Sequence, residues 1–162
     1  MKGTVTIFLF IALLFSSTGY AQQLETTRDS IIHTINNETR YFATGEYEKW
    51  KSLWAHSPKA LHTGASKDGF STRKGWESIH SSFKSYIQDP TTNVPKDKLT
   101  ISRKNFKIVT EHDMAFVHFI SSGNLTPDAP VNDKMESRVL QRIDGKWKIL
   151  YVNTIEISTY EE

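Results

Sequence analysis

The spacing of apolar residues predicts helices in the first half of the chain. Apolar residues recur at near-helical intervals in three segments. The predicted helices cover residues 22–43, 46–54 and 75–88. Gly45 and Pro58 follow the first two segments, as expected where a helix ends. On the first helix, Asp29, Glu38 and Arg40 are assigned to the solvent side.

Alternating apolar and polar residues predict strands in the second half. The predicted strands cover residues 60–63, 99–109, 114–122, 135–143 and 146–158, and a short strand at 70–72 fits the same pattern. Loops are expected at 90–98 and 123–133. Asp144-Gly145 is a dipeptide well suited to closing a two-residue β-hairpin. Helices followed by an antiparallel meander indicate an α+β domain with its helices on one face of the sheet.

The predicted hairpin turn fixes how the last two strands pair. With two turn residues and no bulge, Arg138 lies opposite Tyr151, and Glu136 lies opposite Asn153. These four side chains then share one face of the sheet. A bulge would exchange the faces of one strand and break the cluster. We therefore expect Arg138, Tyr151 and Asn153 to form the polar end of a pocket wall.

The N-terminal segment has the pattern of a secretory signal peptide. Lys2 precedes an apolar run over residues 5–15, and small residues lead to Ala21. This run is too short to span a membrane, which takes about 20 apolar residues. We expect cleavage after Ala21 and a single mature domain over residues 22–162. The expected location is periplasmic or extracellular, with no membrane anchor after cleavage.

Composition excludes several kinds of chemistry. The 162 residues include no cysteine, which excludes cysteine nucleophiles, iron–sulfur clusters and thiolate zinc sites. The six histidines have no metal-ligand spacing and no glycine-rich phosphate loop is present, so we expect neither a metal nor a cofactor. A formal net charge of +2 gives no argument for a nucleic-acid partner.

Several short motifs together resemble the nuclear transport factor 2-like superfamily. Residues 136–139 followed by 144–147 resemble the closing hairpin of the calcium/calmodulin-dependent kinase association domain and of SnoaL-like members. Residues 113–117 resemble a strand opening of the superfamily, and residues 45–54 and 75–76 resemble its second and third helices. The resemblance covers nearly all of residues 22–158, and its strength lies in the order and spacing of the motifs.

The resemblance implies a cone-shaped fold. Three N-terminal helices would pack on a strongly bent antiparallel sheet of about four to six strands. The inside of the bend would form a pocket, and the open sheet face would pair in a homodimer. The association-domain relatives carry an arginine in the pocket at the position of Arg138. Where those relatives have histidines, this chain has Tyr151 and Asn153, so their chemistry is not carried over.

Arg138 is the first candidate for ligand binding. An arginine is always charged and presents a rigid fork to a carboxylate or phosphate. A buried arginine needs a partner. We consider a ligand anion, a strand neighbour or a helix carboxylate such as Glu48, and regard Glu136 as the least suitable.

Aromatic side chains on the predicted helices supply the rest of the pocket wall. Trp54 belongs to the second helix, and Trp76, His80 and Phe83 belong to a stripe along the third. Such a stripe can be core or ligand wall, and in a cone fold the same face serves both.

His62 and His118, on predicted strands, are the catalytic candidates. A histidine near its ordinary pKa can act as a general acid or base. Scytalone dehydratase-like relatives use pocket histidines with Tyr and Asn, and this chain has Tyr151 and Asn153 as the matching residue types. The alternative is that both histidines are structural.

Three functions remain open from the sequence. The first is an exported domain that binds a small, apolar-bodied molecule with an acidic or polar end. The second is a cofactor-free lyase, isomerase or cyclase. The third is a structural homodimerisation module. The fold alone does not choose among them, because one fold hosts many functions.

Overall fold

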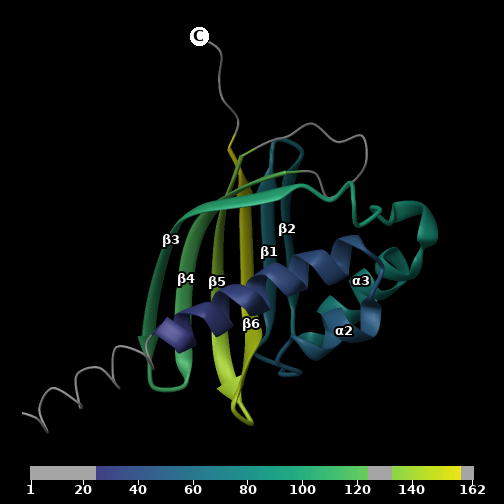
Figure 1. Ribbon diagram of the computed structural model, residues 1–162. Helices are drawn as coiled ribbons and strands as arrows, with labels where there is room; N and C mark the ends of the chain where they lie inside the picture. Colours follow the sequence, from purple (N-terminus) through teal and green to yellow (C-terminus); the bar gives the residue numbers. More distant parts are fainter. Residues whose placement is uncertain (1–24, 124–132, 158–162) are drawn as a thin grey trace, which may run out of the picture.

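The computed structural model describes residues 25–123 and 133–157 (Figure 1). A first helix over residues 25–43 precedes α2 (Tyr47–Ser52), α3 (Trp76–Gln88) and a short 3-10 helix, η1 (Pro90–Thr92). The strands are β1 (Leu61–Ser66), β2 (Gly69–Lys74), β3 (Ile101–Glu111), β4 (Met114–Gly123), β5 (Lys134–Ile143) and β6 (Lys146–Glu156). The α+β class is confirmed. The predicted signal peptide and most of the predicted 123–133 loop lie outside the described residues.

One sheet holds the fold together. Its strand order is β2-β1-β6-β5-β4-β3. The pairs are antiparallel except β1 with β6, which run parallel, so the sheet is mixed rather than purely antiparallel. β3 bends at a bulge between Lys104 and Lys107, where Asn105 has a φ of 60°. Such a bulge adds twist and curvature, and the bent sheet agrees with the expected cone.

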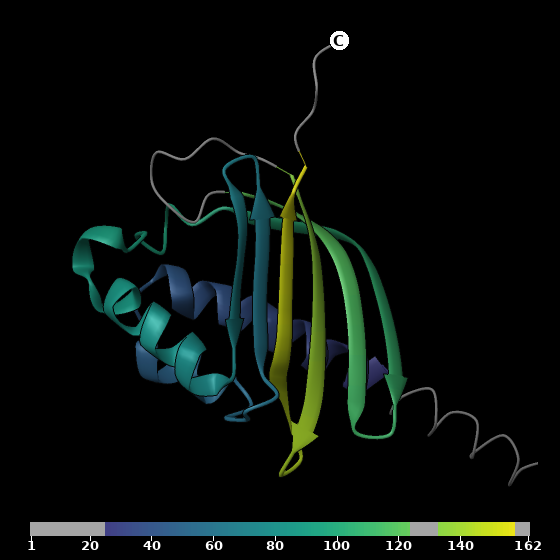
Figure 2. The ribbon, with the colours of Figure 1, turned by 180° about the vertical axis from the view of Figure 1, so that it is seen from behind.

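The helices cover one face of the sheet, called here the inner face. The first helix crosses the long strands β3 to β6, while α2 and α3 lie near β1 and β2 (Figure 1). The opposite, outer face is crossed by none of the described helices (Figure 2). In the described part of the chain, no helix has the length and apolar content to cross a membrane.

The predicted hairpin turn is present. Asp144 and Gly145 have φ angles of 49° and 74°, both in the left-handed region that a type I′ turn requires. Next to the turn, Arg142 lies opposite Trp147, as predicted. The short turn thus starts the pairing in the expected register.

A bulge in β6 overturns the predicted pairing further out. Leu140 lies opposite Ile149, but Val139 lies opposite Tyr151, which leaves Leu150 as an extra residue. One extra residue moves every later side chain of its strand to the other face. Arg138 therefore lies opposite Val152, not Tyr151, and the predicted pair was wrong. For the same reason Glu136 lies opposite Thr154, not Asn153.

The core lies between the helices and the inner face. Trp50, Trp54 and Trp76 are buried with ring centroids 5.7–6.3 Å apart. They pack against apolar residues of the central strands, including Phe119 and Leu140. Burying aromatic rings of this size contributes much of the stability of a core. The packed rings also form a rigid wall beside the space that remains between the helices and the inner face.

Candidate functional site

A cavity of about 240 Å³ lies between the helices and the inner face of the sheet. Its apolar wall consists of Phe42, Trp50, Phe83 and Val152. Its polar lining includes Glu38, His62, Glu136, Arg138 and Thr154. The large aromatic side chains of Phe42, Trp50 and Phe83 form its sides.

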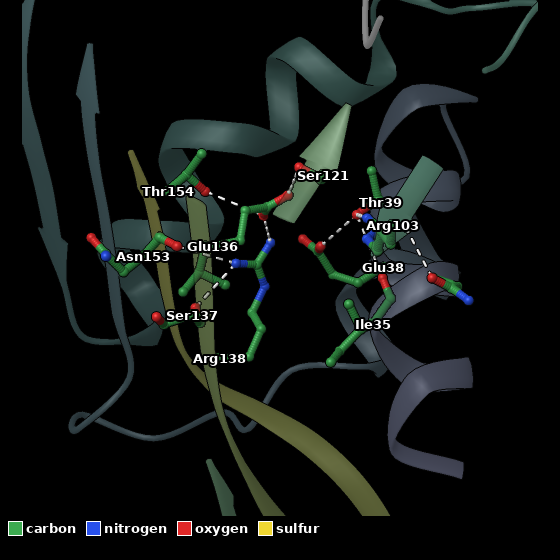
Figure 3. A network of polar contacts seen from close by, with 12 residues as sticks. Ile35, Glu38, Thr39, Arg103, Ser121, Glu136, Ser137, Arg138, Asn153 and Thr154 are labelled. Carbon is green, nitrogen blue, oxygen red and sulfur yellow. Dashed lines mark hydrogen bonds and ion pairs between the residues drawn. The ribbon is translucent and has the colours of Figure 1, made fainter. Parts of the chain in front are cut away.

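Glu136 and Arg138 form a buried ion pair at the polar end of the cavity (Figure 3). They are two positions apart on β5, so they point to the same face. Their residues are only 7% and 3% exposed, and Arg138 Nη2 donates to Glu136 Oε2. The sequence-based view that Glu136 is the least suitable partner was wrong. An arginine side chain is long enough to fold back along its own strand.

Glu136 is held in its ionised form. Its carboxylate also accepts hydrogen bonds from Ser121 Oγ and, at 3.4 Å, from Thr154 Oγ1. Burial by itself would raise the pKa of Glu136, but the charge of Arg138 and the Ser121 bond bring it below its ordinary value. A buried carboxylate is stable only with such partners.

Glu38 brings a second carboxyl to the same place from the first helix (Figure 3). Its Oε1 accepts a hydrogen bond of 3.0 Å from Trp50 Nε1, and the residue is 8% exposed. Its assignment to the solvent side was wrong. Glu38 stands three positions after Ile35 and four before Phe42, on the buried stripe of the helix. Burial raises the pKa of Glu38 despite the nearby Arg138 charge.

Arg103 on β3 joins the network through its contacts with the first helix. Its Nη1 donates to Asn36 Oδ1 at 2.9 Å, and its Nη2 donates to Thr39 Oγ1 at 2.6 Å. The site therefore joins two carboxyls and two guanidinium groups from three elements. Sequence reasoning missed Arg103, because nothing in the pattern of β3 separates it from the surface lysines beside it.

His62 lies in the cavity lining, as a catalytic candidate should. Its ring meets Phe83 edge-on, with centroids 4.8 Å apart. Its Nδ1 is buried and has no hydrogen-bond partner among the described residues. Burial, with the charges of Arg138 and Arg73, lowers the pKa of His62 to about 4, so the ring is neutral at pH 7.

The other polar candidates lie on the outer face. His118 is opposite Ser137, with Nδ1 and Oγ 3.4 Å apart. Tyr151 and Asn153 hydrogen-bond to Thr63 Oγ1 at 3.2 and 2.8 Å. The structure therefore does not bring His118, Tyr151 or Asn153 together with His62 and Arg138.

The aromatic candidates divide between wall and core. Phe83 lines the cavity. Trp54 and Trp76 are buried in the aromatic core and do not line the cavity. His80 stacks on Trp76 and hydrogen-bonds to the Tyr47 hydroxyl. Sequence periodicity identified the correct helix faces but could not place the cavity along them.

The described residues hold no group of three or more His, Asp or Glu side chains that could bind a metal ion. The chemistry available at the site is that of carboxyl, guanidinium and imidazole groups in a partly apolar cavity.

Comparison with known proteins identifies the fold. No family model and no curated protein matches the chain. A nuclear transport factor 2-like superfamily protein from Salmonella enterica aligns over 85% of this chain and 96% of its own, with a TM-score of 0.64 and 16% identity. A protein named as a candidate dehydratase of that family, from Streptomyces avermitilis, covers 83% and 99%, with a TM-score of 0.63 and 12% identity.

A third similar structure is named as a candidate ketosteroid isomerase from Parabacteroides distasonis. It covers 78% of this chain and 87% of its own, with a TM-score of 0.56 and 14% identity. Together these structures show that the chain has the nuclear transport factor 2-like fold, as its motifs suggested. At such low identity the likeness concerns the fold alone, and the function has to be argued from the cavity.

Proposed function

We propose that the chain is an exported domain that binds a small, apolar-bodied molecule in its cavity and forms a homodimer through the outer sheet face. The observation that carries the binding function is a cavity with aromatic walls and a buried polar end. Pockets for organic ligands combine these two features. At about 240 Å³ the cavity is slightly smaller than the usual range of roughly 300–1,000 Å³, which favours a small ligand.

Unsatisfied polar atoms support a binding role. His62 Nδ1 and Arg138 Nε are buried without hydrogen-bond partners in the described part of the chain. Such atoms are rare in native proteins and call for a ligand or an ordered water. Both residues line the cavity, so a bound molecule could satisfy them.

Filling the cavity should abolish binding. Val152 lies on the inner face of β6 and lines the cavity, so Val152→Phe places a ring in the ligand space. Val139→Phe makes the same change at a half-buried position opposite Tyr151 on the outer face. We expect thermal-shift screening with small aromatic fragments to give hits that Val152→Phe loses and Val139→Phe keeps. Loss of the hits in both variants, or in neither, would remove the cavity as the binding site.

The lyase, isomerase or cyclase hypothesis required His118 or His62 in one cavity with Tyr151 and Asn153. The β6 bulge turns Tyr151 and Asn153 to the outer face, away from His62. His118 shares that outer face, but none of these three residues lines the cavity. The proposal of ligand binding needs only the groups that do line the cavity.

The outer face supports the proposal of a homodimer. Large apolar side chains are exposed there on neighbouring strands, with Val109 65% and Phe116 48% exposed. Met114 and Met135 extend the same surface. Contiguous apolar patches on a soluble protein mark interaction sites, and a sheet face that two copies share is self-complementary.

Phe116→Glu should convert the dimer to a monomer. A carboxylate at the centre of an apolar interface loses hydration without gaining a partner, and we expect dimer affinity to fall by at least about 100-fold, or 2.7 kcal/mol. Light scattering and sedimentation measure the change. Tyr86→Glu, at an aromatic residue 37% exposed on α3, is the matched control and should leave the dimer intact. A wild-type monomer at high concentration would contradict the dimer proposal.

The export proposal rests on residues 1–21 and has its own test. Expression of the full chain in a bacterial host should give periplasmic protein whose N-terminal residue is Gln22. Recovery of the uncleaved chain from the cytoplasm would contradict it.

A further inference from the structure

The charge of Arg138 is already balanced inside the protein. Besides its ion pair with Glu136, its Nη1 donates to the carbonyl oxygens of Ser137 at 3.1 Å and Asn153 at 3.4 Å. The guanidinium group also lies over the Phe119 ring, 5.5 Å from its centroid. An incoming carboxylate would therefore not meet the open two-pronged fork that makes arginine a strong anion receptor. Only Nε is left without a partner in the described residues.

The remaining charged groups of the lining do not favour an anion either. Lys134 has Glu156 at 4.0 Å. Glu38 and Glu136 present two carboxyl groups at the same end of the cavity (Figure 3). A ligand carboxylate would be a third, in a site where transfer of an ion from water costs several kcal/mol unless a free counter-charge repays it. A cationic ligand would be repelled by the positive charge of Arg138, which lines the same cavity.

Uncharged polar groups find better partners. His62 Nδ1 is open to one hydrogen bond, and a neutral imidazole nitrogen can donate or accept according to its tautomer. Arg138 Nε can donate one more bond to a carbonyl or hydroxyl oxygen. Around these two atoms the wall is apolar and aromatic, with Phe83 edge-on to His62. A compact ring that carries an amide or alcohol group can hydrogen-bond to these two atoms and pack its ring against the apolar wall.

We propose that the cavity selects an uncharged ligand, a small ring or chain that carries an amide, carbonyl or hydroxyl group, and discriminates against carboxylates and amines. This inference rests on the proposed function, that the cavity binds a small molecule, and it replaces the acidic end expected from the sequence. The discriminating element is the ion pair between Arg138 and Glu136, which withholds the arginine charge from the ligand.

Four probes of similar size test the selectivity. Benzamide and benzyl alcohol are neutral, benzoate is an anion and benzylammonium a cation at pH 7.5. We expect NMR titration of wild-type protein to give affinities for the neutral probes at least about tenfold higher than for either ion. Glu136→Gln frees the Arg138 charge, and in this variant benzoate should gain at least about tenfold while benzamide changes little.

A matched control uses a second acid–arginine pair. Asp113→Asn removes the charged partner of Arg142. Arg142 Nε lies 3.0 Å from Asp113 Oδ1, and both side chains are exposed. It should not change benzoate binding. If benzoate binds wild-type protein as tightly as benzamide, the selectivity proposal is wrong and the binding function stands. If none of the four probes binds, the proposed function itself fails. The wild-type comparison decides the question even where Glu136→Gln does not fold.

Discussion

Glu136→Gln should lower the free energy of unfolding by about 3–5 kcal/mol at pH 7, the usual cost of removing one partner from a buried ion pair. The substitution keeps the size of the side chain and removes its charge. Arg138, 3% exposed, would then hold an uncompensated charge beside the apolar wall. Urea unfolding at pH 7, with the midpoint and slope compared to wild type, measures the loss.

Glu38→Gln is the matched control for this prediction. Burial raises the pKa of Glu38, so ionisation of this carboxyl destabilises the folded state. The contribution of Glu38 to stability is present below its ordinary pKa and is lost as pH rises. Gln removes that cost and can still accept the Trp50 hydrogen bond. We expect stability at pH 7 to stay within about 1 kcal/mol of wild type or to increase. Equal losses in the two variants would show that the carboxyls are equivalent, contrary to the structure.

Acid should destabilise the protein through His62. The pKa of His62 falls from 6.5 to about 4 on folding, so the unfolded chain binds the proton more tightly. Stability is therefore present above pH 6.5 and lost as pH falls toward 4, by about 3 kcal/mol at 1.36 kcal/mol per pKa unit. The lowered pKa of Glu136 adds a loss of the same sign further into acid. The raised pKa of Glu38 acts in the opposite sense, because its contribution to stability is lost as pH rises. Unfolding curves at pH 7 and pH 4 measure the combined effect of the three groups.

Two variants isolate the histidine contribution. His62→Phe removes the titrating group and should lose about 3 kcal/mol less than wild type between pH 7 and pH 4. His118→Phe, at a half-buried position on the outer face, should keep most of the wild-type loss. If His118→Phe flattens the pH profile and His62→Phe does not, the cavity histidine is not the acid-sensitive group.

The sequence was most informative where local rules act. Helical periodicity identified the three helices, and Asp144-Gly145 predicted a two-residue hairpin turn, which the structure shows with a positive φ at both positions. It failed at Leu150, where the bulge has no signature in a single chain. Since strand faces alternate residue by residue, this one insertion moved Tyr151 and Asn153 away from the site.

The charged residues show a second limit. Arg138 and His62, the candidates for ligand binding and catalysis, both line the cavity, but Glu38 was placed in solvent and the pairing with Glu136 was discounted. The first error comes from treating charged residues as exposed by default. The second comes from overlooking that an arginine side chain can fold back along its own strand to a carboxylate two positions away. Burial of a carboxyl on the apolar stripe of a helix can be predicted only when an arginine is known to face it. Folding brings the helix and the strand together, and the sequence alone does not show this contact.

The claim that the cavity binds a small uncharged molecule is tested most directly by the indole N–H signals of the four tryptophans during a benzamide titration. Trp50 lines the cavity and donates its Nε1–H to Glu38, whereas Trp147 lies beside the hairpin turn. We predict a saturable shift of the Trp50 signal with little change at Trp147. A Trp50 signal that stays unchanged at millimolar benzamide, or that shifts no more than Trp147, would contradict the claim.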